Sequence, residues 1–324
     1  MTNTMQAIQI KGPGEAALIE TPMPTPGAGE VLVRVEAVNT CPQWDLHILG
    51  NEPMFPGSTI EYPYPIGQPG HEMAGVVAAT GPGVEGFKTG IKVAAWRDPG
   101  KVRQGCYAQY VPFEEAHLIV LPDELEPREC ASLELAMCVQ ASFDQLNGFN
   151  AVRDCRVIVC GLGPAGLIAA QLAQVHGASD VMALDPLPAR RDMAARLGVA
   201  KVFAPDDPEL LGLLDRGDLW TTGIDCTGLA PALQHLMALC SKYVHVFGVL
   251  RDPVQFGLPE YRKGLALIGY DRHTREAAET ALSLVADGRL DLKPLATHQL
   301  PLADYLEGID LLRSRQAVKI QFLP

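Results

Sequence analysis

A histidine and a glutamate, His71 and Glu72, lie side by side in the small, glycine-rich and otherwise apolar segment QPGHEMAGVVAATGPGV. A neutral imidazole is a preferred zinc ligand, and catalytic zinc takes three protein ligands and leaves one position open. Cysteine thiolates are the expected companions. Cys41 ends the strand-like run EVLVRVEAVNT, and Cys138 lies in a stretch with helical spacing. Cys41 and Cys138 are therefore candidates to join His71 in a metal site, and Glu72 beside it is expected to be a supporting or transient ligand.

Two thiolates and one imidazole would suit the oxidation of an alcohol. Zn²⁺ with two thiolates is close to neutral, so it can acidify a bound alcohol without holding the alkoxide too tightly. The alternative for His71 is a core histidine with satisfied hydrogen bonds. The chain has eight cysteines and no CxxC pair, which argues against a disulfide framework. Most of them are expected to be packing residues.

A second motif, RVIVCGLGPAGLIAAQLAQVHG, has a buried-strand run, a glycine turn and a helix. In this context Gly161 permits the tight turn, Gly163 lets the backbone approach a pyrophosphate, and Gly166 allows close contact between helix and strand. The helix N-terminus offers unpaired N–H groups to an anion. The pattern predicts a dinucleotide site, and a ligand-free packing role for the glycines is the alternative.

The next strand-like run, VMALD, ends in Asp185. A carboxylate at this position can accept hydrogen bonds from both ribose hydroxyls and would repel a 2′-phosphate, so Asp185 favours NAD over NADP. Arg190 and Arg191 follow closely, and an arginine there can pair with a 2′-phosphate. A solvated helix face is the alternative for both arginines.

The order of predicted elements indicates an α/β protein with two domains. Short β-like runs separated by Pro and Gly clusters fill the first 120 residues, and one long helix is expected from about residue 124. Residues 152–270 alternate six strand-like runs with helical stretches, which predicts a doubly wound parallel sheet. The tail contains two helices and a closing strand that could return to the first domain.

The chain resembles the zinc-containing alcohol dehydrogenase family of the medium-chain dehydrogenase/reductase superfamily. The residues that match its signature are Gly70, His71, Glu72, Gly75, Gly81 and Val84. The resemblance implies a GroES-like catalytic domain at residues 1–138 and 273–324 and a Rossmann NAD(P)-binding domain at 139–272. It further implies an NAD-linked dehydrogenase of a secondary or polyol alcohol, with Cys41, His71 and Cys138 as the ligands of one catalytic zinc per chain.

The segment CPQWDLHILG departs from the family pattern. Asp45 and His47 fit the Asp-x-His of relatives, but Gln43 or Trp44 stands where a proton-carrying hydroxyl is expected. We therefore expect His47 to be the outer member of a relay through water, and a surface histidine on a loop is the alternative. The loop AAWRDPGKVRQ is too short and lacks the four cysteines with which many relatives bind a structural zinc.

The charge and composition of the chain indicate which classes of partner are not expected. The net charge is −12 and no run of Lys or Arg occurs, so nucleic acid is not expected. The absence of a signal-like N-terminus and of an 18-residue apolar run predicts a cytoplasmic protein without membrane spans. The edge-like run LALIGY resembles the strand through which relatives pair, which implies a homodimer or homotetramer. A zinc-free quinone or enoyl reductase and a non-catalytic nucleotide-binding protein are the alternative functions.

Overall fold

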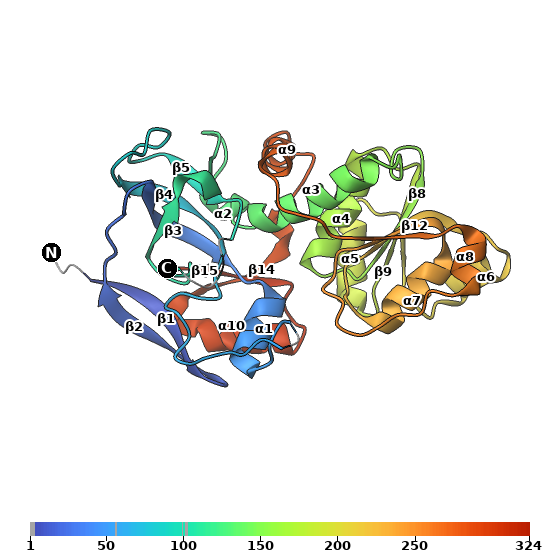
Figure 1. Cartoon of the computed structure of the whole chain (residues 1–324), viewed down its shortest axis with the longest axis horizontal. Helices are drawn as coiled ribbons and strands as arrows, with labels where there is room; N and C mark the ends of the chain where they lie inside the picture. The colour runs from blue at the N-terminus through green and yellow to red at the C-terminus, as the bar shows by residue number, and fades with distance from the viewer. Residues whose placement is uncertain (1–3, 56, 99, 101–102) are drawn as a thin grey trace. The chain divides into compact units, whose positions relative to one another are not determined.

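The computed structural model describes residues 4–55, 57–98, 100 and 103–324 and divides into two compact units (Figure 1). One unit comprises Met1–Leu135 with Leu292–Pro324, and the other comprises Ala136–Asp291. The first unit is therefore closed by the C-terminal tail. The loop for which we predict no structural zinc includes residues 99, 101 and 102, which lie outside the described residues.

The first unit is built around a β-sheet with the strand order β14-β15-β3-β4-β5-β7, and β6 also pairs with β3. Its strands are β3 (Glu30–Asn39), β4 (Glu72–Thr80), β5 (Lys92–Ala95), β6 (Tyr110–Glu114), β7 (Leu118–Val120), β14 (Ala296–Pro301) and β15 (Lys319–Leu323). A separate hairpin contains β1 (Thr4–Gly12) and β2 (Glu15–Pro22). The alternating side chains of β3 explain its place in the sheet, because Val33 and Val35 are buried while Arg34 is exposed.

Two helices of this unit come from opposite ends of the chain. Helix α1 (Pro42–Gly50) and helix α10 (Tyr305–Arg313) pack against each other, as Figure 1 shows. Short 3₁₀ turns are η1 (Glu115–His117), η2 (Lys293–Leu295) and η3 (Leu302–Asp304). Buried Tyr305 and Ile309 on α10 join the core formed by the sheet. The position of α1 matters because it begins directly after Cys41.

The single helix expected from about residue 124 is instead two helices. Helix α2 (Pro127–Cys130) is followed by helix α3 (Leu133–Asn147). The break lies at Ala131 and Ser132, and both residues are buried. The hydroxyl of Ser132 accepts a hydrogen bond from the Asn39 side chain at 2.8 Å. The two helices are therefore separated at a residue that is hydrogen-bonded to β3.

The second unit contains the predicted parallel sheet, with the strand order β10-β9-β8-β11-β12-β13. Its strands are β8 (Arg156–Cys160), β9 (Asp180–Leu184), β10 (Lys201–Phe203), β11 (Trp220–Asp225), β12 (Cys240–Val246) and β13 (Ala266–Gly269). The helices are α4 (Pro164–Val175), α5 (Pro188–Arg196), α6 (Pro208–Asp215), α7 (Ala230–Leu239), α8 (Leu258–Lys263) and α9 (Arg275–Ala286). This order is that of a Rossmann fold, whose ligands bind at the carboxyl ends of the strands.

Candidate functional site

Cys41, His71 and Glu72 converge at one end of the first unit's sheet. Cys41 follows β3 and is the N-cap residue of α1, while Glu72 opens β4. Strands β3 and β4 are antiparallel and pair Asn39 with Glu72. A sulfur, a ring nitrogen and a carboxylate oxygen of the three side chains lie within 4.8 Å of one another. The structure thus brings together two of the predicted ligands and the predicted supporting residue.

One ring nitrogen of His71 is held by the backbone. His71 Nδ1 lies 2.8 Å from the carbonyl oxygen of Pro69. A carbonyl oxygen only accepts hydrogen bonds, so Nδ1 carries the hydrogen and a neutral ring presents its lone pair at Nε2. Nε2 in turn lies 3.9 Å from Glu134 Oε2. This is the tautomer and the orientation that metal-binding histidines need.

Acidic groups surround the buried His71 ring. Burial by itself lowers the pKa of His71, but the hydrogen bond with Cys41 and the charges of Cys41, Glu134 and Asp98 raise it well above its ordinary value. Burial raises the pKa of Glu134 to about 7, although the charge of His71 lowers it. A half-buried thiol beside a buried imidazole and a buried carboxyl group is a donor set that suits a divalent metal.

Glu72 adds an unsatisfied oxygen to this cluster. Its Oε1 forms a buried ion pair with Lys319. Its Oε2 is buried and has no hydrogen-bond partner among the described residues. An orphaned carboxylate oxygen is costly in a low-dielectric interior. Its lone pairs therefore fit a cation bound to the neighbouring Cys41 and His71.

Glu134 is the residue that the sequence reasoning missed. It lies on α3 and its side chain is buried, four residues before Cys138. Residues four apart share one face of a helix, so the text SLELAMC contained a signal that pointed to both side chains. Cys138 is also buried, and its sulfur lies within 4.8 Å of a ring nitrogen of His273 in the second unit. The role of Cys138 as a ligand stays a prediction.

The two relay candidates on α1 have different surroundings. Asp45 is fully buried and accepts hydrogen bonds from Tyr107 at 2.8 Å and from Tyr305 at 3.0 Å. Burial raises the pKa of Asp45 to about 6, although these hydrogen bonds lower it. His47 Nδ1 lies 2.9 Å from the carbonyl oxygen of Glu52, which leaves Nε2 as its proton acceptor. His47 lies on a helix and not on a loop, and its role in a relay stays a prediction.

The three motif glycines of the second unit occupy distinct positions around the turn. Gly161 has a φ of 88°, which favours glycine. A Cβ on Gly166 would lie 1.7 Å from the Gly161 carbonyl oxygen, so helix α4 could not approach β8 with any larger residue. A Cβ on Gly163 would meet nothing within 4 Å. Internal packing therefore does not explain Gly163, whereas the approach of a ligand to the N-terminus of α4 does.

Asp185 follows β9 and holds the same turn. Its Oδ2 accepts from the Leu162 N–H and its Oδ1 from the Leu187 N–H, both at 2.8 Å. Each carboxylate oxygen has a second lone pair, so both can still accept from ribose hydroxyls. Arg191 donates to the Asp185 carbonyl oxygen at 2.7 Å. Burial lowers the pKa of Arg190 and the Asp185 charge raises it, so this arginine is close to the same carboxylate.

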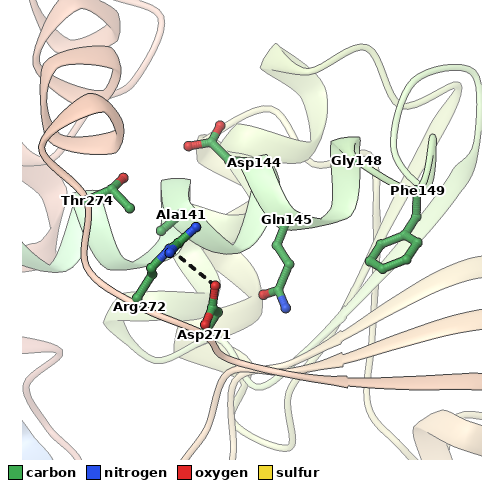
Figure 2. Close-up of a pocket in the computed structure, with 8 residues that line it drawn as sticks. All are labelled: Ala141, Asp144, Gln145, Gly148, Phe149, Asp271, Arg272 and Thr274. Atoms are coloured by element: carbon green, nitrogen blue, oxygen red, sulfur yellow. Dashed lines mark ion pairs between the residues drawn. The ribbon is translucent and has the colours of Figure 1, made fainter.

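The second unit also contains a cavity of about 420 Å³ along the C-terminal half of α3, shown in Figure 2. Asp144 and Gln145 line it from the helix, and Asp271 and Arg272 line it from the segment before α9. Arg272 Nε and Asp271 Oδ2 form an ion pair at 3.4 Å. The cavity thus lies on the same helix as Cys138 and the same segment as His273, but neither of these residues is among those that line it.

Two family descriptions match this chain. Residues 27–123 match the alcohol dehydrogenase GroES-like domain, and residues 164–287 match the zinc-binding dehydrogenase domain. Together the matches span more than half of the chain, and their order is that of the two units described above. The chain belongs to the zinc-containing alcohol dehydrogenase family of the medium-chain dehydrogenase/reductase superfamily. As a member, it is an oxidoreductase that transfers hydride between an alcohol and a nicotinamide cofactor.

Full-length relatives support this assignment. Sorbitol dehydrogenase of Halalkalibacterium halodurans is 26% identical, with 97% of both chains covered. L-threonine 3-dehydrogenase of Bacillus licheniformis is 28% identical, with 100% of both chains covered. The fold is that of a zinc-binding dehydrogenase from Sinorhizobium meliloti bound to NADP, with a TM-score of 0.84, 22% identity and 99% of both chains covered. No helix in the described part of this zinc-containing alcohol dehydrogenase has the length and apolar character to cross a membrane.

Proposed function

We propose that this protein is an NAD-linked dehydrogenase of a secondary or polyol alcohol, with one catalytic zinc per chain. The observation that carries the proposal is the convergence of Cys41, His71 and Glu134. His71 donates through Nδ1 to Pro69 and presents Nε2 to the Glu134 carboxylate, beside the Cys41 sulfur. Cys41 and His71 are ligands predicted from the sequence, and the short distances between their donor atoms suit a metal.

The third ligand comes from helix α3 in this proposal. Glu134 is favoured over Cys138 because its carboxylate lies 3.9 Å from the nitrogen that His71 presents to the site. A thiolate from Cys41 and a carboxylate from Glu134 would balance the charge of one Zn²⁺. Cys138 remains the alternative, as the sequence predicts. Glu72 is a supporting residue in either arrangement.

The chemistry of the reaction divides between bound groups and side chains. Zinc and NAD, when bound, would polarise the alcohol oxygen and accept the hydride, respectively. The Pro69 carbonyl orients His71, and the Asp185 carboxylate fixes the glycine turn while it keeps lone pairs for the ribose. His47, whose Nε2 is left as the acceptor, would take a proton from a water and pass it to solvent.

NAD is preferred over NADP in this proposal because Asp185 is a buried acceptor at the end of β9. A buried carboxylate repels a 2′-phosphate, and this supports the role of Asp185. Arg190 is the residue that could weaken the preference. The Sinorhizobium meliloti dehydrogenase is bound to NADP, but its cofactor is a property of that protein and does not extend to this chain at 22% identity. The ratio of turnover with the two cofactors tests the preference here.

The proposed substrate class follows from the relatives. Sorbitol and threonine, which the names of these relatives give, both offer a secondary alcohol with a polar group on a neighbouring carbon. A turnover panel of polyols, hydroxy amino acids and simple secondary alcohols would rank these classes.

Assembly, location and domain roles remain predictions. Strand β13 forms one edge of the sheet, and the exposed side chains of Leu258, Tyr261 and Leu267 lie on or near it. An apolar edge of this kind supports a homodimer or homotetramer, which sedimentation would test. Residues 139–272 are proposed as the NAD domain, and 1–138 with 273–324 as the catalytic domain, in a cytoplasmic protein.

The first experiment measures zinc per chain by elemental analysis. Protein purified without a chelator or a metal-binding tag is compared with His71→Ala. We expect about one zinc in the parent and little in the variant, since loss of a ligand frees the metal. Parent protein that binds NAD(H) but contains no zinc would refute the proposed mechanism and would favour a zinc-free reductase.

A further inference from the structure

Lys319 is a fully buried lysine on the last strand of the chain, β15. A buried ammonium group is costly unless it is hydrogen-bonded and paired with a negative charge. Lys319 meets both conditions, since its Nζ lies 2.6 Å from the Thr40 carbonyl oxygen and pairs with Glu72 Oε1. These partners are the sequence neighbours of two expected zinc ligands, because Thr40 precedes Cys41 and Glu72 follows His71.

The contact with Thr40 is one of several that fix this backbone. The Thr40 N–H donates to the Ile320 carbonyl oxygen at 2.9 Å, and the Ile320 N–H donates to Thr40 Oγ1 at 2.9 Å. Strand β15 therefore holds the peptide that precedes Cys41 by its N–H, its side chain and, through Lys319, its carbonyl. Cys41 begins helix α1 directly after this anchored residue.

The strand also reaches the segment that leads into Glu134. Gln321 pairs with Asn39 in the sheet and donates to its Oδ1 at 3.1 Å. Asn39 donates to Ser132 Oγ at 2.8 Å, two residues before Glu134. A continuous row of buried polar side chains thus links β15 to all three ligand-bearing segments. Hydrogen bonds of this kind hold metal ligands in one orientation.

Lys319 also determines the net charge of the proposed metal site. The Lys319 ammonium neutralises Glu72, so the charges left to balance a divalent metal are those of Cys41 and Glu134. Without Lys319, Glu72 would be an unpaired buried carboxylate within 4.8 Å of the Cys41 and His71 donor atoms. Two effects would then compete, because the ligand segments lose an anchor while the site gains a free carboxylate. The contact with Thr40 makes loss of the anchor the larger effect.

We propose that Lys319 is a positioning residue of the zinc centre, which fixes the Thr40–Cys41 backbone and the Glu72 carboxylate so that the site retains its metal. This inference rests on the proposed function, because it requires that Cys41 and His71 bind zinc. It assigns a role in the metal site to the C-terminal strand, whose residues contribute no predicted ligand.

The test measures how fast zinc leaves the intact, zinc-loaded enzyme. Zinc transfer to a chromogenic chelator is followed for the parent and for Lys319→Met, which keeps the length of the side chain and removes its charge. We expect release about 10- to 100-fold faster from Lys319→Met, the range typical of residues that orient metal ligands.

Lys92→Met is the matched control. Lys92 Nζ donates to the carbonyl oxygens of Asp123 and Leu125, each at 3.1 Å, and pairs with Glu126 Oε1 at 2.9 Å. It therefore makes the same kinds of contact in the same unit, on partners that are not next to a predicted ligand. We expect this variant to lose stability but to release zinc within about twofold of the parent rate, since its loss moves no ligand.

Cobalt adds a spectroscopic readout that loss of stability alone would not change. The d–d absorption of the Co²⁺-substituted enzyme depends on the arrangement of the ligand atoms. We expect this absorption to shift in Lys319→Met and to remain that of the parent in Lys92→Met. An unchanged spectrum in Lys319→Met would contradict the positioning role.

The outcomes separate the two proposals. Parent enzyme without zinc would refute the zinc function itself, whereas a zinc-containing parent and a Lys319→Met variant with equal or slower release would refute only the role of Lys319. If Lys319→Met does not fold, Lys319→Met with Glu72→Gln removes both buried charges and is compared with Glu72→Gln alone. Faster release from the double variant supports the proposal, and equal rates overturn it.

Discussion

The two proposed sites of this dehydrogenase, one for the nucleotide and one for the metal, are built in opposite ways. The nucleotide site lies in one continuous segment, in which β8, the glycine turn, α4, β9 and Asp185 follow one another. The metal centre draws on Cys41, His71, Glu134 and Lys319, which lie far apart in the chain. A site built from one continuous motif can be recognised in the sequence. A site assembled from distant segments shows only some of its residues there.

The largest effect is expected for Glu134, the proposed third ligand of the metal. Glu134→Gln keeps the shape of the side chain and removes its charge beside His71. We expect zinc content and kcat/KM to fall by at least about 100-fold, because even residues that merely orient a ligand cost up to that much. Elemental analysis and steady-state kinetics measure the two effects.

Cys138→Ser is the counterpart on the same helix. We expect this variant to keep its zinc, with a change in kcat/KM below about tenfold, because the sulfur is not a ligand in our proposal. The reverse result, with zinc lost from Cys138→Ser and kept by Glu134→Gln, would restore the ligand set that the sequence predicts. The contrast between the two sites would then largely disappear.

In the proposed nucleotide site, a substitution at Asp185 is expected to change the cofactor preference. Asp185→Asn removes the charge that accepts from the ribose hydroxyls and repels a 2′-phosphate. We expect the ratio of kcat/KM with NAD to that with NADP to fall about 10- to 100-fold, the equivalent of one hydrogen bond to a charged group. The variant also weakens the hydrogen bonds to Leu162 and Leu187, but this loss affects the binding of both cofactors equally. The ratio therefore reports only the interaction of residue 185 with the ribose hydroxyls or the 2′-phosphate. An unchanged ratio would assign Asp185 to the turn alone.

The second unit should have its own sensitivity to acid. Burial lowers the pKa of His245 from 6.5 to about 4, and its side chain is fully buried. Between these values the unfolded chain binds a proton that the folded chain does not, so stability is lost as the pH falls below about 6.5. The loss reaches about 2 kcal/mol at about pH 5.

His245→Gln removes this titration. Urea unfolding at neutral pH and at about pH 5 should show a smaller loss of stability in the variant than in the parent, by about that amount. Because His245 lies in the second unit, the difference between the two proteins is separate from any loss of zinc in acid. An equal loss in both would show that His245 is protonated in the folded chain.

The smallest effect concerns the relay. We expect His47→Gln to lower kcat/KM at neutral pH by less than about tenfold, below the roughly hundredfold typical of a positioned acid or base, because water can reach the site in its place. A pH profile of kcat/KM measures the change. A variant whose profile matches the parent would remove His47 from the mechanism.

Much of the fold was predictable because it depends on local patterns. The six parallel strands follow from apolar runs separated by helical stretches, and the glycine turn follows from its spacing. The interruption between α2 and α3 was not predictable in the same way. Residues with good helical spacing surround Ser132, which is buried at the break and bonded to Asn39, 93 residues away in sequence.

The sequence by itself determined the family and the glycine turn, and it predicted Cys41 and His71 as residues of one metal site, because these depend on residue types at fixed short spacings. Tertiary structure decided which side chains complete the metal centre. A glutamate on a helix and a lysine near the C-terminus look in sequence like ordinary solvated charges. Only the fold shows Glu134 facing His71 and Lys319 buried against Glu72, since strand pairing, not chain distance, places them there.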